Sequence, residues 1–403
     1  MNKIKWIFIT LFLLLFLRSA TAGVAQDNCQ EENPCNYSDL NQQISCLEAN
    51  REACRRQRDT LSSEIAYMNS QIRLTTLRIE ATQSKISALT SEINDLENEV
   101  EKLESILTRR LTLLSRRVPE SYKRAVIPQF GLLLFSKNFS DFITRVKYLM
   151  SVQEEDAALV FQVKATQNNY NERKQTREEK KNQLKDVQTE LERQNARLAS
   201  QKQEKNALLT ATQGNEAKFQ ELLEHAREQL AAIREFVTGA GGASILNNQT
   251  VCDGWGCYYN QRDSQWAGYT LGSSSYTVAE SGCLITSVAM IASHYKKDIK
   301  PSDLASNPAL FFGSTGYLYQ GTISVKGVSI TRWAGASIDS QLAAGNPVIV
   351  GVYRGPGHFI VLKSGSNGHY VMNDPFWPNG HDIDFSSHYS VSDITEIDTI
   401  NVN

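Results

Sequence analysis

The sequence has no long basic tract, and its formal net charge is −2. Chains that bind nucleic acid usually gather Lys and Arg on one face, so no nucleic-acid partner is expected. Past residue 17 there is also no apolar run long enough to cross a bilayer. Candidate metal ligands are too loosely spaced for a metal site, so neither a metal nor another cofactor is expected. The set considered for a metal comprises His369, His381, Asp382 and Asp384.

Cysteine is scarce and unevenly distributed, with seven in the chain. Four lie near the N-terminus, two flank a turn-prone loop and one stands alone: Cys29, Cys35, Cys46 and Cys54; Cys252 and Cys257; and Cys283. On a shared helix, Cys46 and Cys54 would lie about 12 Å apart, too far for a disulfide between them. Each then pairs with Cys29 or Cys35, pairs with another chain, or stays reduced. In an exported protein the leftover cysteine is a candidate reactive thiol.

The N-terminus has the form of a signal peptide. Two lysines precede an apolar run at residues 6–17, and small residues at 20–22 fit a cleavage site. We therefore expect residues 1–22 to direct export, which makes the mature protein secreted or bound to the cell envelope. Arg18 leaves an uncleaved anchor as the alternative. A Cys-containing segment at 23–39 follows.

A strict heptad repeat of apolar residues runs through positions 61–107. β-Branched residues dominate one seam position and Leu is common at the other, which favours a two-stranded coiled coil. The first seam position holds Ile65, Ile72, Ile79, Ile86, Ile93, Val100 and Leu107; the second holds Leu61, Met68, Thr75, Thr82, Leu89, Leu96 and Leu103.

A second helical run is expected at residues 152–236, with a patchier seam. Gln194, Gln201 and Lys205 occupy seam positions there, so this half is expected to be held less firmly. Between the two runs, Pro119 ends or kinks the first helix. We assign residues 40–236 to a coiled coil with an apolar tip at 119–150.

Two arrangements of this coiled coil remain open. The arms at 40–118 and 152–236 each span roughly 120 Å, and equal arms suit an antiparallel hairpin. The heptad composition instead suits a parallel homodimer. The apolar residues at 126–150 either pack on one another or dock on a partner, such as a membrane protein.

The composition changes after a small-residue linker at 237–250, and residues 251–403 are long enough to form an independent domain. Within it, Ser281-Gly282 forms a turn before a helical pattern that begins at Cys283. The free N–H groups and dipole of a first helical turn favour a thiolate over a thiol. The alternative is that Cys283 is a buried core residue.

A β-hairpin is predicted at residues 358–374, with its turn centred on Ser366. In that register His358 lies directly opposite Asp374, with Cβ atoms about 5 Å apart on one face of the sheet. An imidazole and a carboxylate at that distance form a hydrogen bond. Asn373 would point to the other face, and a slip of one residue would change the choice.

A thiol, an imidazole and a carboxylate can together cleave an amide bond. His358 would take the proton of Cys283 and later protonate the leaving amine, while Asp374 would orient the imidazole. The backbone N–H of Cys283 and the side chain of Gln261 are the candidate oxyanion donors, with Gln265 as the fallback. Each of these residues also has an ordinary structural explanation, as a core, turn or surface residue.

At these positions the chain resembles the C39-like branch of the papain-like cysteine peptidases. The motifs are Asn260-Gln261-Arg262-Asp263-Ser264-Gln265-Trp266-Ala267, Gly282-Cys283, Gly357-His358-Phe359 and Asn373-Asp374-Pro375. The resemblance implies Cys283 as nucleophile, His358 as base, Asp374 as third member and Gln261 as oxyanion donor. Leu284-Ile285 stands where many members have Gly-Pro, which leaves the substrate class open.

The N-terminal half is similar to the coiled-coil regions of exported peptidoglycan hydrolases and their activators, which answer to a divisome ABC transporter. The local likeness lies at residues 134–146. Together the two resemblances imply an α+β protein with a long helical coiled-coil hairpin and a papain-like peptidase domain. The expected function is an exported bacterial cysteine peptidase that acts on peptidoglycan peptides or envelope proteins. The alternative is a non-enzymatic adaptor or hydrolase activator with a peptide-binding head. A further hypothesis is that the helical arm covers the Cys283 cleft.

Overall fold

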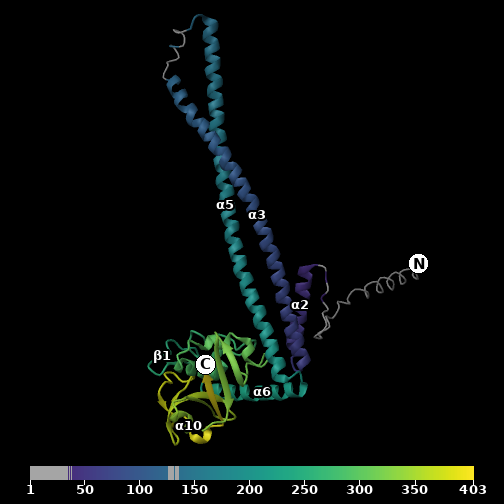
Figure 1. The fold of residues 1–403 in the computed structure, drawn as a ribbon, viewed down its shortest axis with the longest axis vertical. Coiled ribbons are helices and arrows are strands. Elements are labelled where there is room, and N and C mark those ends of the chain that lie inside the picture. The colour runs from purple at the N-terminus through teal and green to yellow at the C-terminus, as the bar shows by residue number, and fades with distance from the viewer. Residues whose placement is uncertain (1–34, 36, 38, 126–130, 132–135) are drawn as a thin grey trace, which may run out of the picture. The chain divides into compact units, whose positions relative to one another are not determined.

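The structure is a computed structural model that describes residues 35, 37, 39–125, 131 and 136–403. The chain divides into two units: Arg78–Asn195, and the chain up to Leu77 together with Ala196–Asn403. Long helices precede an antiparallel sheet domain, which confirms the predicted fold class (Figure 1). The expected signal peptide, Cys29, and residues 126–130 and 132–135 of the expected tip lie outside the described residues.

The helical half consists of α2 (Leu40–Arg56), α3 (Leu61–Ala125), α5 (Phe139–Thr212) and α6 (Glu216–Gly239). The second arm was predicted as one helix over 152–236, and this is wrong at its start and in its interior, where α5 ends and α6 begins. The helix begins earlier because Asn138 accepts a hydrogen bond from the N–H of Asp141 and caps the first turn of α5. It breaks at Gln213 and Gly214, whose φ angles of 52° and 66° are left-handed.

The first arm also differs from its predicted bounds of 40–118. Residues 57–60 separate α2 from α3, so the arm is two helices. The second of these does not end at Pro119 but continues through it to Ala125. A proline removes its own hydrogen bond and its ring crowds the carbonyl four residues earlier, but in so long a helix the neighbouring turns keep their hydrogen bonds.

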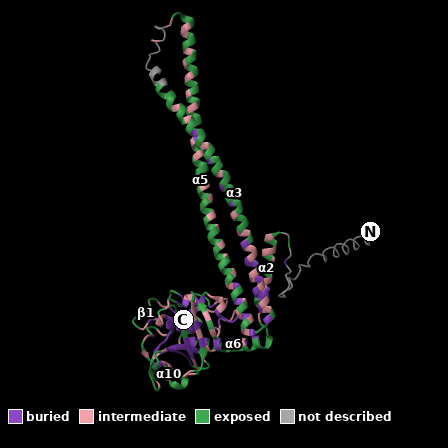
Figure 2. Cartoon of the chain, viewed as in Figure 1, coloured by how far each residue is buried: buried purple, intermediate pink, exposed green. Residues whose placement is uncertain are grey.

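In the Arg78–Asn195 unit, α3 and α5 lie side by side and run antiparallel (Figure 1). Ion pairs join Glu92 to Lys180 at 2.7 Å and Glu99 to Arg173 at 3.2 Å. Residue numbers in α5 therefore decrease as those of their partners in α3 increase, as expected for antiparallel helices. The heptad positions of α3 in this unit are buried or half-buried, while the intervening positions are mostly exposed (Figure 2). The buried seam residues in this unit are Ile79, Leu89, Ile93, Val100 and Leu107. The seam is therefore covered by a helix of the same chain.

Polar seam residues of α5 meet polar residues of α3. Hydrogen bonds join Thr82 to Gln194, Gln71 to Gln201 and Asn69 to Lys205, at 3.1, 3.1 and 2.7 Å. A polar seam residue without such a partner would be costly to bury. These pairs therefore fix the register between α3 and α5 where apolar contacts are sparse.

The C-terminal domain is built on a seven-stranded antiparallel sheet in the order β3-β4-β9-β5-β6-β7-β8. The strands are β3 (Gly321–Val325), β4 (Val328–Ala334), β5 (Val348–Val352), β6 (His358–Ser366), β7 (His369–Asn373), β8 (Ile383–Asp384) and β9 (Glu396–Val402). A separate pair, β1 (Val251–Cys252) and β2 (Cys257–Tyr258), is closed by the Cys252–Cys257 disulfide.

The helices of this domain are α7 (Val278–Ser281), α8 (Cys283–His294), α9 (Pro301–Ala305) and α10 (Ile338–Ala343). The central one is α8, which packs against β6 and whose residues from Cys283 to Ala292 are all buried. Ile233, Phe236 and Val237 of α6 belong to the same apolar core as α8. The last turns of α6 are thus part of the C-terminal domain's packing.

The segment predicted as a flexible linker, 237–250, is bonded to the domain. Its first residues are the end of α6. Leu246 then forms backbone hydrogen bonds with Arg262 and Ser264, both at 2.8 Å, and the carbonyl of Ser244 accepts one from the Arg262 side chain at 2.7 Å. Although its small residues are typical of a flexible linker, this segment is held against the domain by these hydrogen bonds.

The disulfides agree with the helix argument for the N-terminal cysteines. Cys46 and Cys54 both lie on α2, and Cys46 pairs with Cys35. Cys54 is also disulfide-bonded. Among the described cysteines, Cys283 alone is a free thiol.

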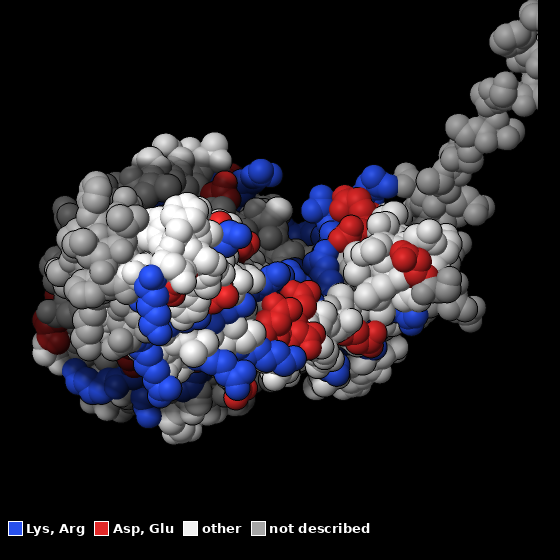
Figure 3. Space-filling view, turned by 90° about the horizontal axis from the view of Figure 1, so that it is seen from above, with Lys and Arg blue, Asp and Glu red and all other residues white. Residues whose placement is uncertain are grey.

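The described surface mixes the two signs of charge. Figure 3 shows Lys and Arg interspersed with Asp and Glu over the visible face. Within the described part of the chain, no helix has both the length and the hydropathy needed to span a bilayer.

Candidate active site

Cys283 is the first residue of α8, as the sequence predicted. Gly282 separates it from α7, and a Cβ at that position would lie 2.5 Å from the carbonyl oxygen of Val278. Only glycine fits this close turn between the two helices. The turn places the sulfur and the backbone N–H of Cys283 in the first turn of α8, whose N–H groups have no partners within the helix.

His358 and Asp374 are joined by a hydrogen bond of 2.8 Å from Nε2 to Oδ1. Because Nε2 faces the carboxylate, Nδ1 is the ring nitrogen left for Cys283, whose side chain is near enough to raise the pKa of His358. The imidazole and the carboxylate predicted to meet therefore do meet, while the role of Cys283 as nucleophile beside them stays a prediction.

The register argument that paired His358 with Asp374 is wrong, although the contact is present. The turn falls at Asn367-Gly368, and a bulge between Leu362 and Ser364 shifts the pairing, so that Val361 lies opposite Asn373. β7 ends at Asn373, and Asp374 reaches the imidazole from the loop that follows.

Electrostatics favour a charged imidazole beside the thiol. Burial alone would lower the pKa of His358, but the Asp374 carboxylate, its hydrogen bond to the ring and the nearby Cys283 side chain raise it to about 9. Burial would raise the pKa of Asp374, yet the charge of His358 and its hydrogen bonds hold that pKa below its usual value. The site therefore holds a proton on His358 at neutral pH.

Sequence reasoning missed Tyr389, which completes the shell around Asp374. Its hydroxyl donates to Oδ2 of Asp374 at 2.8 Å, and the N–H of Phe376 donates to Oδ1 at 2.8 Å. With His358, three donors therefore hold the carboxylate. Tyr389 lies outside any regular element and carries no local motif, so only the fold reveals its position.

Gln261 is buried and lies beside the helix that leads to Cys283. Its Nε2 donates to the carbonyl of Ala279 at 2.7 Å, and its Oε1 has no hydrogen-bond partner. One of the two Nε2 hydrogens remains for an oxyanion, so the proposed donor role stays a prediction. Gln265, the fallback, is exposed and bonds to Thr250 and Asp263 instead.

No cluster of three or more His, Cys, Asp or Glu in the described ranges is arranged to hold a metal ion. This includes the four residues considered from the sequence, His369, His381, Asp382 and Asp384. Asp382 instead pairs with Lys363, and Asp384 accepts hydrogen bonds from Ser386.

The second unexpected residue is Phe236, near the C-terminal end of α6. Its ring lies flat on the imidazole of His358, with centroids 4.2 Å apart and planes 7° apart. Sequence reasoning took this stretch for coiled-coil seam, because an apolar residue at heptad spacing looks the same in either role. With α6 in place, Cys283, His358 and Asp374 are at most 1% exposed.

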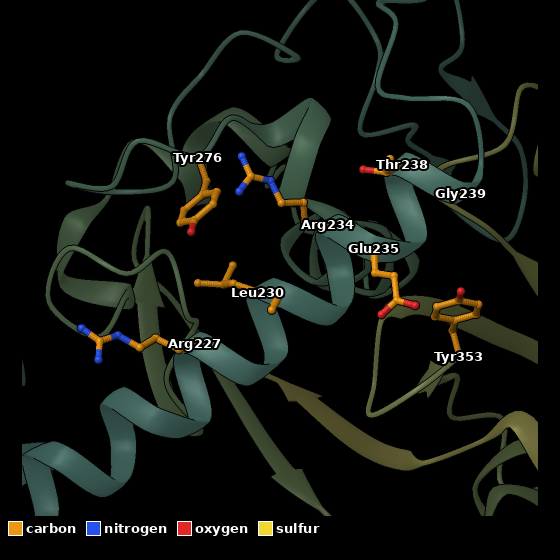
Figure 4. Close-up of a pocket in the computed structure, with 9 residues that line it drawn as sticks. Arg227, Leu230, Arg234, Glu235, Thr238, Gly239, Tyr276 and Tyr353 are labelled. Carbon is orange, nitrogen blue, oxygen red and sulfur yellow. The ribbon is translucent and has the colours of Figure 1, made fainter.

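α6 also leaves an open space along its length. A cavity of about 650 Å³ is lined by α6 residues that include Leu230 and Arg234, and by Tyr276 and Tyr353 of the sheet domain (Figure 4). In Figure 4 the two tyrosines stand on either side of α6. The cavity therefore lies where α6 meets the domain that carries Cys283.

Comparison with known families agrees with this geometry. Residues 257–391 match the Peptidase_C39 like family. The C-terminal domain is C39-like. No curated protein and no solved structure matches the chain. The stretch that defines the C39-like domain contains Gln261, Cys283, His358, Asp374 and Tyr389, whereas Phe236 lies outside it.

Proposed function

We propose that the protein is an exported cysteine peptidase whose C39-like domain hydrolyses amide bonds and whose α6 helix keeps it closed. The observation that carries the proposal is the hydrogen bond between His358 and Asp374, with the free thiol of Cys283 near the same imidazole. Peptidoglycan peptides and envelope proteins are the substrates proposed for it.

The reaction follows from the positions of these groups. The sulfur of Cys283 attacks the amide carbon and forms an S–C bond, while the oxygen becomes an oxyanion near the start of α8. The C–N bond breaks, and His358 gives the leaving amine the proton that came from the thiol. Water then hydrolyses the thioester, with His358 as base. Asp374, held by Tyr389, keeps the imidazole oriented throughout.

Burial of the site supports a closed resting state. A peptide must reach the sulfur and the imidazole together, and the Phe236 ring covers the imidazole. Opening the site therefore requires the end of α6 to move. The earlier hypothesis was that the whole helical arm covers Cys283, and we now assign that role to α6 alone. The non-enzymatic alternative predicts a different result. An adaptor does not use Cys283 as a nucleophile, so moving α6 would not produce hydrolysis.

Export is supported by the form of residues 1–22, and the Cys35–Cys46 and Cys252–Cys257 disulfides are compatible with it. We also propose that the apolar region at 126–150 binds a membrane protein. Supporting this, Phe139 is 75% exposed at the start of α5, and Tyr148 and Met150 are exposed farther along the same helix.

The test of the peptidase function uses the full chain opened by Phe236→Ala. This variant should cleave unstructured peptides, and adding Cys283→Ala should remove the activity entirely while leaving the circular dichroism spectrum unchanged. Product masses identify the cleaved bond. Equal hydrolysis with and without the sulfur would contradict the proposal.

A further inference from the structure

The ring of Phe236 sits in a box of aromatic side chains. Its flat face rests on His358, and its edges meet three other rings at angles near perpendicular. Those rings are Phe376, Tyr353 and Trp377, with centroids 5.3, 5.7 and 6.5 Å away. Edge-to-face arrangements of this kind are favourable because the positive edge of one ring meets the negative face of another.

All four walls of this box belong to the C39-like domain, and the occupant does not. His358, Tyr353, Phe376 and Trp377 lie inside the 257–391 match, whereas Phe236 comes from the helix before it. The C39-like domain thus supplies every wall of the box, directly against the imidazole, and α6 supplies only the occupant. If α6 leaves, the pocket is open at the position where a substrate must bind.

One wall is held in a strained backbone conformation. Tyr353 has a φ of 67°, which is rare for a bulky residue. Such strain is typical of residues that clamp a ligand. Here it turns the Tyr353 ring toward Phe236, across the loop between β5 and β6.

Access to the box depends on a close approach of α6. A Cβ at Gly357 would lie 2.9 Å from the carbonyl oxygen of Ala232 in α6 and 2.8 Å from the Tyr353 ring. The helix therefore touches the domain backbone beside His358. The contact leaves no room for a peptide between them.

We propose that this aromatic box is the substrate's side-chain subsite, and that Phe236 occupies it as an internal substitute for a bulky apolar residue flanking the scissile bond. The proposal rests on the peptidase function proposed above. It names the substrate class as a protein or peptide with an aromatic side chain at that position. Peptidoglycan stem peptides carry no aromatic residue and would leave the box empty.

The experiment uses the full-length Phe236→Ala chain and a set of unstructured peptides that differ at one residue. Purified peptidoglycan is incubated in parallel. We expect cleavage beside Phe, Tyr or Trp to exceed cleavage beside Ala by about tenfold or more, a ratio within reach of an apolar pocket. Adding Trp377→Ala should reduce this ratio chiefly through KM, because one wall of the box is lost.

Phe219→Ala is the matched control, since it shortens another buried ring of α6 that packs on Phe312 and not on His358. It should not reproduce the gain in activity. Gly357→Ala keeps Phe236 but crowds α6 from the other side, and it should raise hydrolysis with the same aromatic preference. If Phe236→Ala does not fold, Gly357→Ala still tests whether displacing α6 gives hydrolysis with a preference for aromatic residues.

The outcomes separate the two proposals. Cleavage without preference for aromatic residues, equal activation by Phe219→Ala, or equal cleavage of peptidoglycan would overturn the subsite and leave the peptidase function standing. No cleavage of any substrate by either opened and folded variant would count against the peptidase function itself.

Discussion

At the residue scale, the site depends on how tightly one carboxylate is held. Asp374 accepts hydrogen bonds from His358, from the Phe376 N–H and from Tyr389, so both of its oxygens are occupied. If this buried carboxylate lost one donor, the folded state would be destabilised, because a hydrogen bond would no longer offset the free-energy cost of removing that oxygen from water. Tyr389 is therefore a positioning residue for the imidazole.

We expect Tyr389→Phe to lower the free energy of unfolding by about 1–3 kcal/mol, because one oxygen of Asp374 loses its partner. In the opened Phe236→Ala background, kcat should fall about tenfold, which corresponds to about 1.4 kcal/mol. Urea unfolding and peptide hydrolysis measure the two effects. Tyr370→Phe is the control, since it removes a 2.8 Å hydrogen bond to Asp339 elsewhere. It should affect stability only, and a similar loss of kcat there would contradict the role of Tyr389.

The residues of the site were predictable because chemistry restricts them, whereas their geometry was not. A lone cysteine at a helix start and a histidine followed by an aspartate can be found by inspection. The bulge at Leu362 and Ser364 is invisible in the sequence, because it changes the pairing without changing the alternation of side chains nearby. Asp374 meets His358 through a loop, and no strand register describes a loop.

At the scale of elements, the base of the helical hairpin holds two buried acids. Glu64 on α3 and Glu204 on α5 lie near Arg58, whose Nε is 3.9 Å from Glu64. Across from them are Tyr319 and the loop that carries Phe312, which packs on Phe219 of α6. Burial raises the pKa of each carboxyl to about 7, with the charge of Arg58 opposing the shift.

The raised pKa values of Glu64 and Glu204 predict that the native state is more stable at acidic pH. The native pKa of about 7 exceeds the unfolded value of 4.5, so the native state binds protons more tightly. The stabilisation is full below about pH 4.5 and is lost as the pH rises through about 7. Thermal melts of the full chain should therefore give a higher Tm at pH 5 than at pH 7.5.

The double variant Glu64→Gln, Glu204→Gln isolates these two groups, because glutamine keeps the shape and does not ionise. The difference in Tm between pH 5 and pH 7.5 should shrink in this variant. Glu92→Gln removes an exposed acid of the same helix and should leave the difference as in the native chain. A pH dependence that is the same in all three proteins would contradict the assignment.

Helix boundaries followed from the sequence only where caps were recognised. The heptads of α3 located the seam, and each seam position in Arg78–Asn195 is buried or half-buried. The break at Gln213-Gly214 has a sequence signal, a glycine followed by the capping Asn215, which the long polar pattern obscured. Two-stranded pairing was predictable, but its direction was not, because Ile and Leu seams pack in both orientations.

At the scale of the whole molecule, one chain carries both the proposed catalytic groups and α6, whose Phe236 ring lies on His358. The C39-like match begins at residue 257, after α6 has ended. The helix that bears Phe236 is also continuous in sequence with the coiled-coil arm, separated from α5 only by residues 213–215. A force or a partner acting on the arm therefore has a covalent route to the element that closes the site.

The most direct measurement is the rate at which iodoacetamide alkylates Cys283, followed at pH 7 by mass spectrometry of the peptide that contains it. It is compared in full-length Phe236→Ala and in the same chain with His358→Ala added. The account predicts fast alkylation in the first, and alkylation at least about tenfold slower in the second, because His358 no longer takes the thiol proton. Equal rates in the two proteins would mean that His358 does not activate the sulfur.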